Sequence, residues 1–148
     1  QMETIVVDAS VITKWYIAEE HSEQALKLRD DYIEGKLTLT APSLMPYEVL
    51  NAVKRAKKDT SMEILVAVAE SLTLYGIRFQ ELHRELARLT VKIAIENDVT
   101  IYDAAYIALA ELSDTTLYTA DERLRESLRD AYRKHVIHIK DYGHIEES

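Results

Sequence analysis

Cysteine is absent from this 148-residue sequence, and glycine and proline are scarce, with three and two residues. The absence of cysteine excludes a disulfide framework and a thiolate metal site. So few glycines and prolines leave little room for linkers, and no internal repeat or change in composition marks a second domain. We therefore expect residues 2–148 to form a single domain, which is long enough to bury one hydrophobic core.

Long apolar stretches are also missing from the sequence. No run approaches the roughly 20 residues that a membrane-spanning helix needs. The N-terminus has no positive region followed by an apolar segment, so we expect no signal peptide. These absences favour a cytoplasmic protein that does not enter a membrane. Asn and Gln are rare beside many Glu, Lys and Arg residues, a composition that favours a thermophilic source.

Positive charge is in deficit: the formal net charge is -8 and the pI is about 5.1. This balance argues against broad electrostatic binding of nucleic acid over the whole surface. It leaves open a local site where metal ions offset the negative charge. The share of hydrophobic residues, 47%, and of charged residues, 30%, is that of an ordinary globular protein.

Apolar runs of strand type alternate with segments of helical periodicity along the chain. This alternation predicts an α/β sandwich around a mainly parallel sheet. We expect strands at 3–7, 36–42, 76–82, 115–121 and 135–140, and helices at 10–18, 22–34, 43–58, 61–74, 83–97, 102–112 and 122–132. The helix at 102–112 is apolar or small on nearly every side, so we expect it to be buried.

Acidic residues recur where the apolar runs end. The first strand ends on Asp8, with the hydroxyl of Ser10 two residues later, and another apolar run leads to Asp103. The segment TLYTAD ends on Asp121, two residues after Thr119. Because ligand sites of parallel sheets form outside the carboxyl ends of the strands, we expect these acids to meet at one edge.

A fourth acid, Glu48, lies on the helix expected at 43–58. It shares a stripe with Asn51 and Arg55, three and seven residues further on, at the border of the apolar stripe. Glu48 can therefore lean toward the same edge of the sheet as the other acids.

Each acid also has a purely structural alternative. Asp8 and Asp121 are suitable N-caps for the helices that follow them. Asp103 can be the third residue of a capping box that begins at Thr100, and Glu48 can be a solvated helix residue. The four acids together are harder to explain in this way than each one alone.

Gathered carboxylates without basic partners repel one another and raise each other's pKa. A hard divalent cation relieves this repulsion, and a set of oxygen ligands points to Mg²⁺ or Mn²⁺ rather than zinc. Such a site is suited to phosphodiester hydrolysis. The acidic segments offer no histidine or cysteine as nucleophile, so covalent catalysis is not expected.

A basic run stands at the end of the helix that carries Glu48. Four of its five residues are cations, which suits a helix C-terminus electrostatically. Beside an acidic site they can instead bind the phosphates of a substrate. The candidates for substrate binding are Lys54, Arg55, Lys57 and Lys58 of this run, together with Lys14 and Arg123.

Four segments resemble, in order and spacing, the acidic motifs of the PIN domain: VVDASVITKW, APSLMPYEVLNAV, IYDAAYIALA and LYTADERL. The likeness covers essentially the whole chain and is closest to the VapC-type toxins of prokaryotic toxin–antitoxin pairs. It implies a PIN-like three-layer α/β/α sandwich and a Mg²⁺- or Mn²⁺-dependent endoribonuclease. By this resemblance the metal-site acids are Asp8, Glu48, Asp103 and Asp121, the supporting hydroxyls belong to Ser10 and Thr119, and Asn51 is a neighbour of Glu48.

The resemblance also implies partners. They are an RNA substrate, a small VapB-like antitoxin that inhibits the toxin, and a second copy of the chain, for which helices 61–74 and 83–97 offer apolar surfaces. Two alternatives remain open, namely a PIN-like nuclease that acts on DNA or in RNA maturation, and a non-catalytic module that binds metal or a partner. The presence of all four acids argues against the non-catalytic module.

Overall fold

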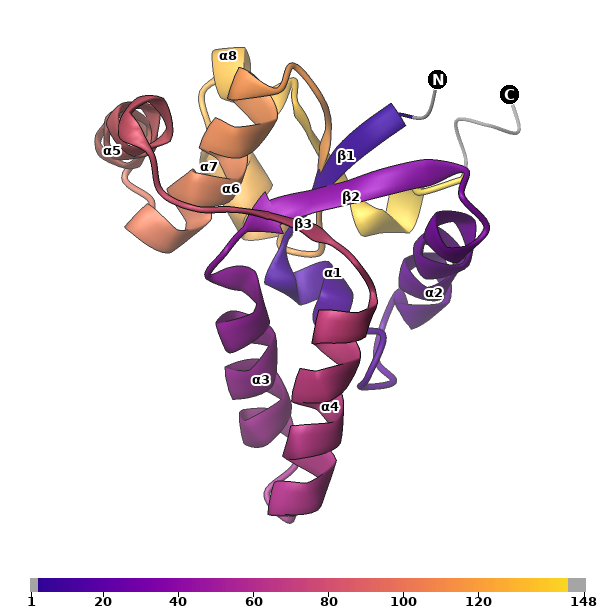
Figure 1. Ribbon diagram of the computed structural model, residues 1–148. Helices are drawn as coiled ribbons and strands as arrows, with labels where there is room; N and C mark the ends of the chain where they lie inside the picture. Colours follow the sequence, from indigo (N-terminus) through magenta and orange to yellow (C-terminus); the bar gives the residue numbers. More distant parts are fainter. Residues whose placement is uncertain (1–2, 144–148) are drawn as a thin grey trace.

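Five strands form one parallel sheet in the computed structural model, which describes residues 3–143 (Figure 1). Each pairing between neighbouring strands is parallel, so the sheet is more uniform than the mainly parallel one predicted. The strand order is β3-β2-β1-β4-β5. The strands are β1 (Glu3–Val7), β2 (Leu37–Pro42), β3 (Arg78–Gln80), β4 (Leu117–Thr119) and β5 (Val136–His138).

Strand β1 lies in the middle of the sheet. Its apolar residues Ile5, Val6 and Val7 are all buried, and β-branched side chains of this kind pack well on a sheet that is covered on both faces. Residue Val6 is in register with Leu117 of β4. The carboxyl ends of β1 and β4 are therefore neighbours, and the segments that follow them leave the sheet at the same edge.

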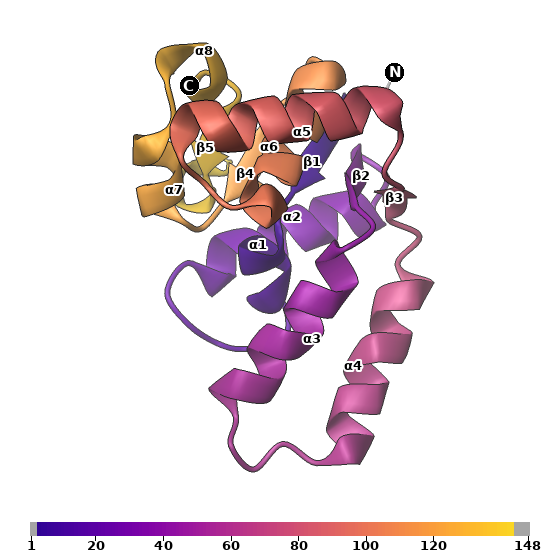
Figure 2. The same cartoon turned by 90° about the vertical axis from the view of Figure 1, so that its left-hand side faces the viewer.

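Helices cover both faces of the sheet, as the two orthogonal views show (Figures 1 and 2). One face is covered by α6 (Ile101–Leu112), which packs on β1, β2 and β4 and is backed by α5 (Arg84–Asn97). The other face carries α1 (Ala9–Thr13) and α2 (Ser22–Ile33). This arrangement confirms the three-layer α/β/α sandwich.

Helix α6 is buried from Ala104 to Ala110, as its sequence predicted. It lies between the sheet and α5, and its four alanines allow close approach to both. The first turn, with Asp103, is the part that reaches the edge of the layer. Within residues 3–143 no helix is long and apolar enough to cross a membrane.

Two further helices, α3 (Met45–Ala56) and α4 (Met62–Leu74), lie side by side and project from the sheet as an arm (Figures 1 and 2). Helix α3 begins three residues after β2, so its first turn starts at the carboxyl edge of the sheet. It buries Met45, Val49 and Val53, and this apolar stripe fixes which side of the helix turns away from the core.

Some element boundaries differ from those predicted. Helix α3 begins at Met45, with Leu44 at its N-cap, rather than at residue 43. The cap of α4 is Ser61, whose hydroxyl accepts the Ile64 N–H. Helix α1 ends at Thr13 rather than at residue 18. Strand β5 is followed by a short 3-10 turn, η1 (Ile139–Asp141).

The helix predicted at 122–132 is two helices, α7 (Glu122–Ser127) and α8 (Asp130–Arg133). The chain is extended at Leu128, which inserts its side chain into the core. The Asn97 side chain then accepts the backbone N–H of Arg129 at 2.8 Å, which satisfies a donor that the break would expose. The free energy gained by burying Leu128 therefore exceeds that lost by interrupting the helix.

Candidate metal centre

The structure gathers the four predicted acids around one pocket of about 540 Å³ at the carboxyl edge of the sheet. Asp8 comes from the end of β1, Glu48 from the first turn of α3, Asp103 from the first turn of α6, and Asp121 from the start of α7. Other residues lining the pocket are Ala9, Ser10, Thr13, Lys14, Glu19, Ala52, Arg55, Ala56, Tyr106 and Ala120.

Asp8 is buried at the floor of this pocket, with 6% of its surface exposed. Its Oδ1 accepts the backbone N–H of Ser10 at 3.0 Å as the N-cap of α1, and it also accepts the Ser10 hydroxyl. Burial raises the pKa of Asp8 to about 6, hydrogen bonds from Ser10 and Thr119 oppose the rise, and the charge of Asp103 adds to it. Asp8 is thus the N-cap of α1, and the capping hydrogen bond also holds its carboxylate inside the pocket.

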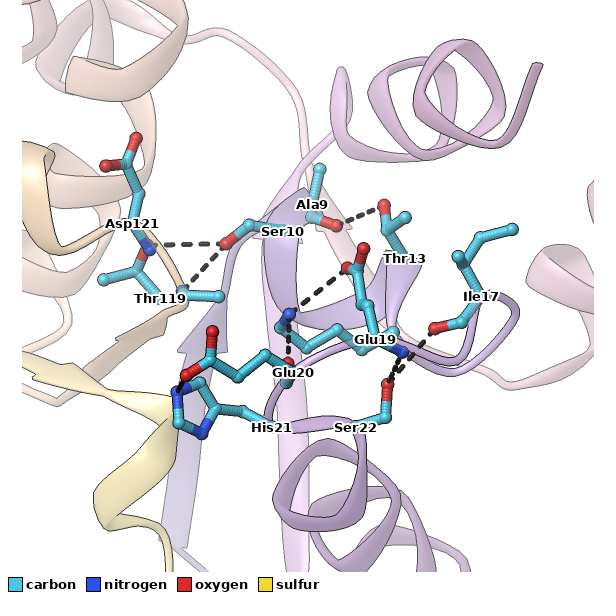
Figure 3. A network of polar contacts seen from close by, with 12 residues as sticks. Ala9, Ser10, Thr13, Ile17, Glu19, Glu20, His21, Ser22, Thr119 and Asp121 are labelled. Carbon is cyan, nitrogen blue, oxygen red and sulfur yellow. Dashed lines mark hydrogen bonds and ion pairs between the residues drawn. The ribbon is translucent and has the colours of Figure 1, made fainter. Parts of the chain in front are cut away.

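Two hydroxyls join the ends of β1 and β4 (Figure 3). The Ser10 Oγ accepts the backbone N–H of Ala120 at 2.9 Å and lies 3.5 Å from the Thr119 Oγ1. The Thr119 Oγ1 in turn accepts the backbone N–H of Asp121 at 3.0 Å. Ser10 and Thr119 therefore fix the backbone that carries Asp8 and Asp121.

Asp121 is exposed and caps α7, since its Oδ1 accepts the Leu124 N–H at 3.0 Å. Asp103 also follows its structural alternative, because its backbone N–H donates to the Thr100 hydroxyl at 3.0 Å. Burial raises the pKa of Asp103, and the neighbouring charge of Asp121 raises it further. Two of the four acids, Asp8 and Asp121, are thus helix caps, and Asp103 lies in the first turn of a helix that Thr100 caps.

Glu48 is half-buried and receives a hydrogen bond from a residue that the sequence did not single out. The Tyr106 hydroxyl donates to the Glu48 Oε1 at 2.5 Å. Burial raises the pKa of Glu48, the Tyr106 hydrogen bond lowers it, and the Asp103 charge raises it. Tyr106 lies three residues after Asp103 on α6, and this spacing places both on the same face of the helix. In an apolar helix, however, a tyrosine also fits the core.

The donor chemistry of the pocket fits a hard divalent cation. All four acids offer carboxylate oxygens, and within residues 3–143 no ion pair joins any of them to a basic side chain. The carboxylates are not already arranged as a metal site, since no group of three acidic or histidine side chains in the described part of the chain could hold an ion as it stands. Hydrogen bonds now engage one oxygen each of Asp8, Glu48 and Asp121. Mutual repulsion also keeps unneutralised carboxylates apart.

The predicted cations are distributed unevenly around the pocket. Arg55 lines it, and so does Lys14. The Lys14 side chain is buried, and its Nζ donates to the Glu19 Oε1 at 3.2 Å and to the Glu20 carbonyl at 2.6 Å. Lys14 is therefore part of the wall rather than the rim, and Glu19 is a fifth acid there. The other four candidates, Lys54, Lys57, Lys58 and Arg123, are exposed and do not line the pocket. A role of these cations in substrate binding stays a prediction.

Asn51 does not line this pocket. The residues of α3 that do are Glu48, Ala52, Arg55 and Ala56, which follow a helical spacing of three and four residues. Asn51, three residues after Glu48, lines a separate groove toward α4. Asn51 and Glu48 line a neighbouring hollow together, so Asn51 is a neighbour of Glu48, and a role of Asn51 in the site stays a prediction.

Comparison with known proteins places this fold in a family. A model of the PIN domain matches residues 5–127. Ribonuclease VapC3 from Pyrobaculum aerophilum is 34% identical over 128 residues, which cover 82% of this chain and 92% of that protein.

Solved structures with the same fold include two toxin systems. The Mycobacterium tuberculosis toxin VapC20, described as cleaving the sarcin–ricin loop, has a TM-score of 0.66 at 15% identity, over 83% of this chain and 94% of that one. The DNA-bound VapBC complex from Salmonella typhimurium has a TM-score of 0.63 at 17% identity, over 93% of this chain and 99% of that one. The sequence match and the shared architecture agree: this chain belongs to the PIN domain family and is a VapC-type member of it.

Proposed function

We propose that this protein is a Mg²⁺- or Mn²⁺-dependent endoribonuclease that hydrolyses RNA phosphodiester bonds and acts as the toxin of a toxin–antitoxin pair. The observation that carries the proposal is the meeting of four carboxylates without ion-pair partners, within residues 3–143, in one pocket. The match to a relative that is named a ribonuclease supports RNA as the substrate.

The proposed ligands of the cation are Asp8, Glu48, Asp103 and Asp121. When bound, such an ion supplies Lewis-acid polarisation of a phosphoryl group and activation of water. The chain's own contribution is to hold the ligands: Ser10 and Thr119 fix the backbone on either side of the pocket. Arg55, on the pocket wall, offers positive charge to a substrate phosphate.

Cleavage of single-stranded RNA by the pure protein should fall to background in excess EDTA and return when excess Mg²⁺ or Mn²⁺ is added. The reason is that the pocket offers carboxylate oxygens as ligands, and no histidine or cysteine lines it to act as base or nucleophile. The assay follows a labelled oligonucleotide on a gel, with a metal-independent ribonuclease in the same buffer as the control. Undiminished cleavage in EDTA would show that the proposed chemistry is wrong.

The proposed inhibitor is a small antitoxin protein that fills the groove between α3 and α4. This groove, of about 600 Å³, is mainly apolar and is separate from the acidic pocket. A partner segment that packs there can reach around α3 and place a basic side chain among the acids. The lining residues are Leu50, Asn51, Lys54, Met62, Leu65, Val66 and Ala69.

Purification from the native host should yield a complex with a second protein, and the complex should cleave RNA much more slowly than the toxin alone. Native mass spectrometry of the same material reports whether two copies of this chain associate, for which the exposed Val91 and Ile95 of α5 are the proposed contact. A complex with its native partner that remained fully active would contradict inhibition through the pocket.

A further inference from the structure

Tyr106 is a tyrosine whose hydroxyl is buried in the acidic pocket. Only 2% of its surface is exposed, and it lies one turn after Asp103 on α6. Its Oη donates to the Glu48 Oε1 at 2.5 Å, which links α6 to α3 across 58 residues of chain. No other hydrogen bond from a side chain of the described residues reaches the Glu48 carboxylate.

At this buried position a tyrosine has an advantage over a phenylalanine only if its hydroxyl has a hydrogen-bond partner. Burial of a hydroxyl without a partner costs free energy, whereas a phenylalanine fills nearly the same space without that cost. A hydrogen bond to an ionised carboxylate is short and stronger than one between neutral groups. The bond therefore restrains a side chain that otherwise has three rotatable bonds and lies half-exposed at the start of a helix.

We propose that Tyr106 is a positioning residue that holds Glu48 through Oε1 and so leaves Oε2 available to ligate a divalent cation. This inference rests on the proposed function, because it assigns a task to Tyr106 within the same site. Partners of this kind, which orient a ligand without touching the metal, commonly change metal affinity or activity by about 10- to 100-fold when they are removed.

The chain contains a matched hydrogen bond outside the pocket. The Tyr132 hydroxyl donates to the Glu96 Oε1 at 2.6 Å, between α8 and α5, and Tyr132 is buried to a similar degree. Neither residue lines the acidic pocket. Tyr132→Phe therefore removes the same chemical interaction and reports the purely structural cost of doing so.

The test measures Mn²⁺ binding to the full chain by isothermal titration calorimetry, without RNA. Tyr106→Phe should weaken Mn²⁺ binding about tenfold, and Tyr132→Phe should not weaken it. In a Glu48→Gln background, the same Tyr106→Phe substitution should have no further effect, because Tyr106 acts through the Glu48 carboxylate. Cleavage by Tyr106→Phe should be low at limiting Mn²⁺ and recover at saturating Mn²⁺.

Unchanged Mn²⁺ affinity in Tyr106→Phe would overturn the inference. The inference would also fail if Tyr106→Phe lowered the Mn²⁺ affinity of Glu48→Gln as much as it lowers that of wild type. If Tyr106→Phe does not fold, Mg²⁺ is titrated into wild type with ¹³C-labelled tyrosine rings. A Tyr106 Cζ resonance that stays still while the ion binds would then overturn it. Failure of the proposed function looks different, because wild type itself would neither bind Mn²⁺ nor cleave RNA.

Discussion

Asp103→Asn should abolish cleavage of RNA and at the same time raise the melting temperature of the metal-free protein. The substitution removes one proposed cation ligand and keeps the volume of the side chain. A bound cation contributes several kcal/mol to the stabilisation of the transition state, and each 1.36 kcal/mol is a factor of ten in rate. We therefore expect the cleavage rate to fall by at least about a thousandfold.

The gain in stability follows from repulsion within the pocket. Two carboxylates about 5 Å apart repel by roughly 3 kcal/mol at an effective dielectric constant of ~20, before screening and proton uptake. Asp103 is partly exposed, so screening reduces this figure and we expect a gain of about 1 kcal/mol in the free energy of unfolding. For a chain of this length, such a gain raises the melting temperature by about 2–4 °C.

The measurement compares melting curves in EDTA and in Mg²⁺, alongside a cleavage assay. Wild type should gain more stability from Mg²⁺ than Asp103→Asn, because the ion binds the folded state preferentially. The control is Asp59→Asn, which makes the same change in net charge at an exposed position between α3 and α4. A variant that was less stable in EDTA and still cleaved RNA would show that Asp103 is only a helix-capping residue.

The metal-free protein should lose stability as the pH rises from about 4 to about 7, and Asp8→Asn should remove most of this loss. Burial raises the pKa of the Asp8 carboxyl from its ordinary 3.8 to about 6, so the folded state binds this proton more tightly than the unfolded state does. The resulting stabilisation is fully present below pH 3.8 and is lost as the pH rises through about 6.

The size of the effect follows from the same two values. One pKa unit corresponds to about 1.36 kcal/mol, so the rise from 3.8 to about 6 amounts to about 3 kcal/mol. Other carboxylates titrate in this range too, so the informative quantity is the difference between wild type and Asp8→Asn at each pH. Asn stays neutral and still caps a helix well.

Urea unfolding in EDTA at several pH values between 4 and 8 gives this difference directly. The free energy of unfolding of Asp8→Asn should exceed that of wild type at pH 7.5, and the two should converge near pH 4. Parallel pH profiles would mean that Asp8 ionises in the folded state as easily as in the unfolded state.

The position of the acidic pocket was predictable from the sequence, because acids that follow neighbouring parallel strands lie at the same edge of the sheet. In a parallel sheet the ends of neighbouring strands share an edge, so acids after β1 and β4 meet there whatever else the chain does. The three-layer fold was predictable for a related reason, since strands and helices alternate with distinct periods. A catalytic role of the four acids remains a proposal, because capping also explains the positions of Asp8 and Asp121.

Other features depend on tertiary contacts that no local pattern records. Tyr106 looks like a core residue in an apolar helix, and only the tertiary fold brings its hydroxyl to Glu48 of α3. The break between α7 and α8 arises because the core accepts Leu128, although the helical pattern continues through it. Lys14, predicted as a substrate-binding cation, is buried, because its partners Glu19 and Glu20 come from the following loop.

The hydrogen bond between Ser10 and Ala120 joins residues that are 110 positions apart in the sequence. This separation determines how early during synthesis of the chain the pocket can form. A ribosome adds about 5–20 residues per second, so Ala120 is synthesised on the order of 5–20 s after Ser10. Contacts between such distant segments also form late in folding. A growing chain that has not reached β4 therefore lacks Asp121 and the hydrogen bond from Ala120 to Ser10, so the proposed cation site cannot form before these residues have been synthesised.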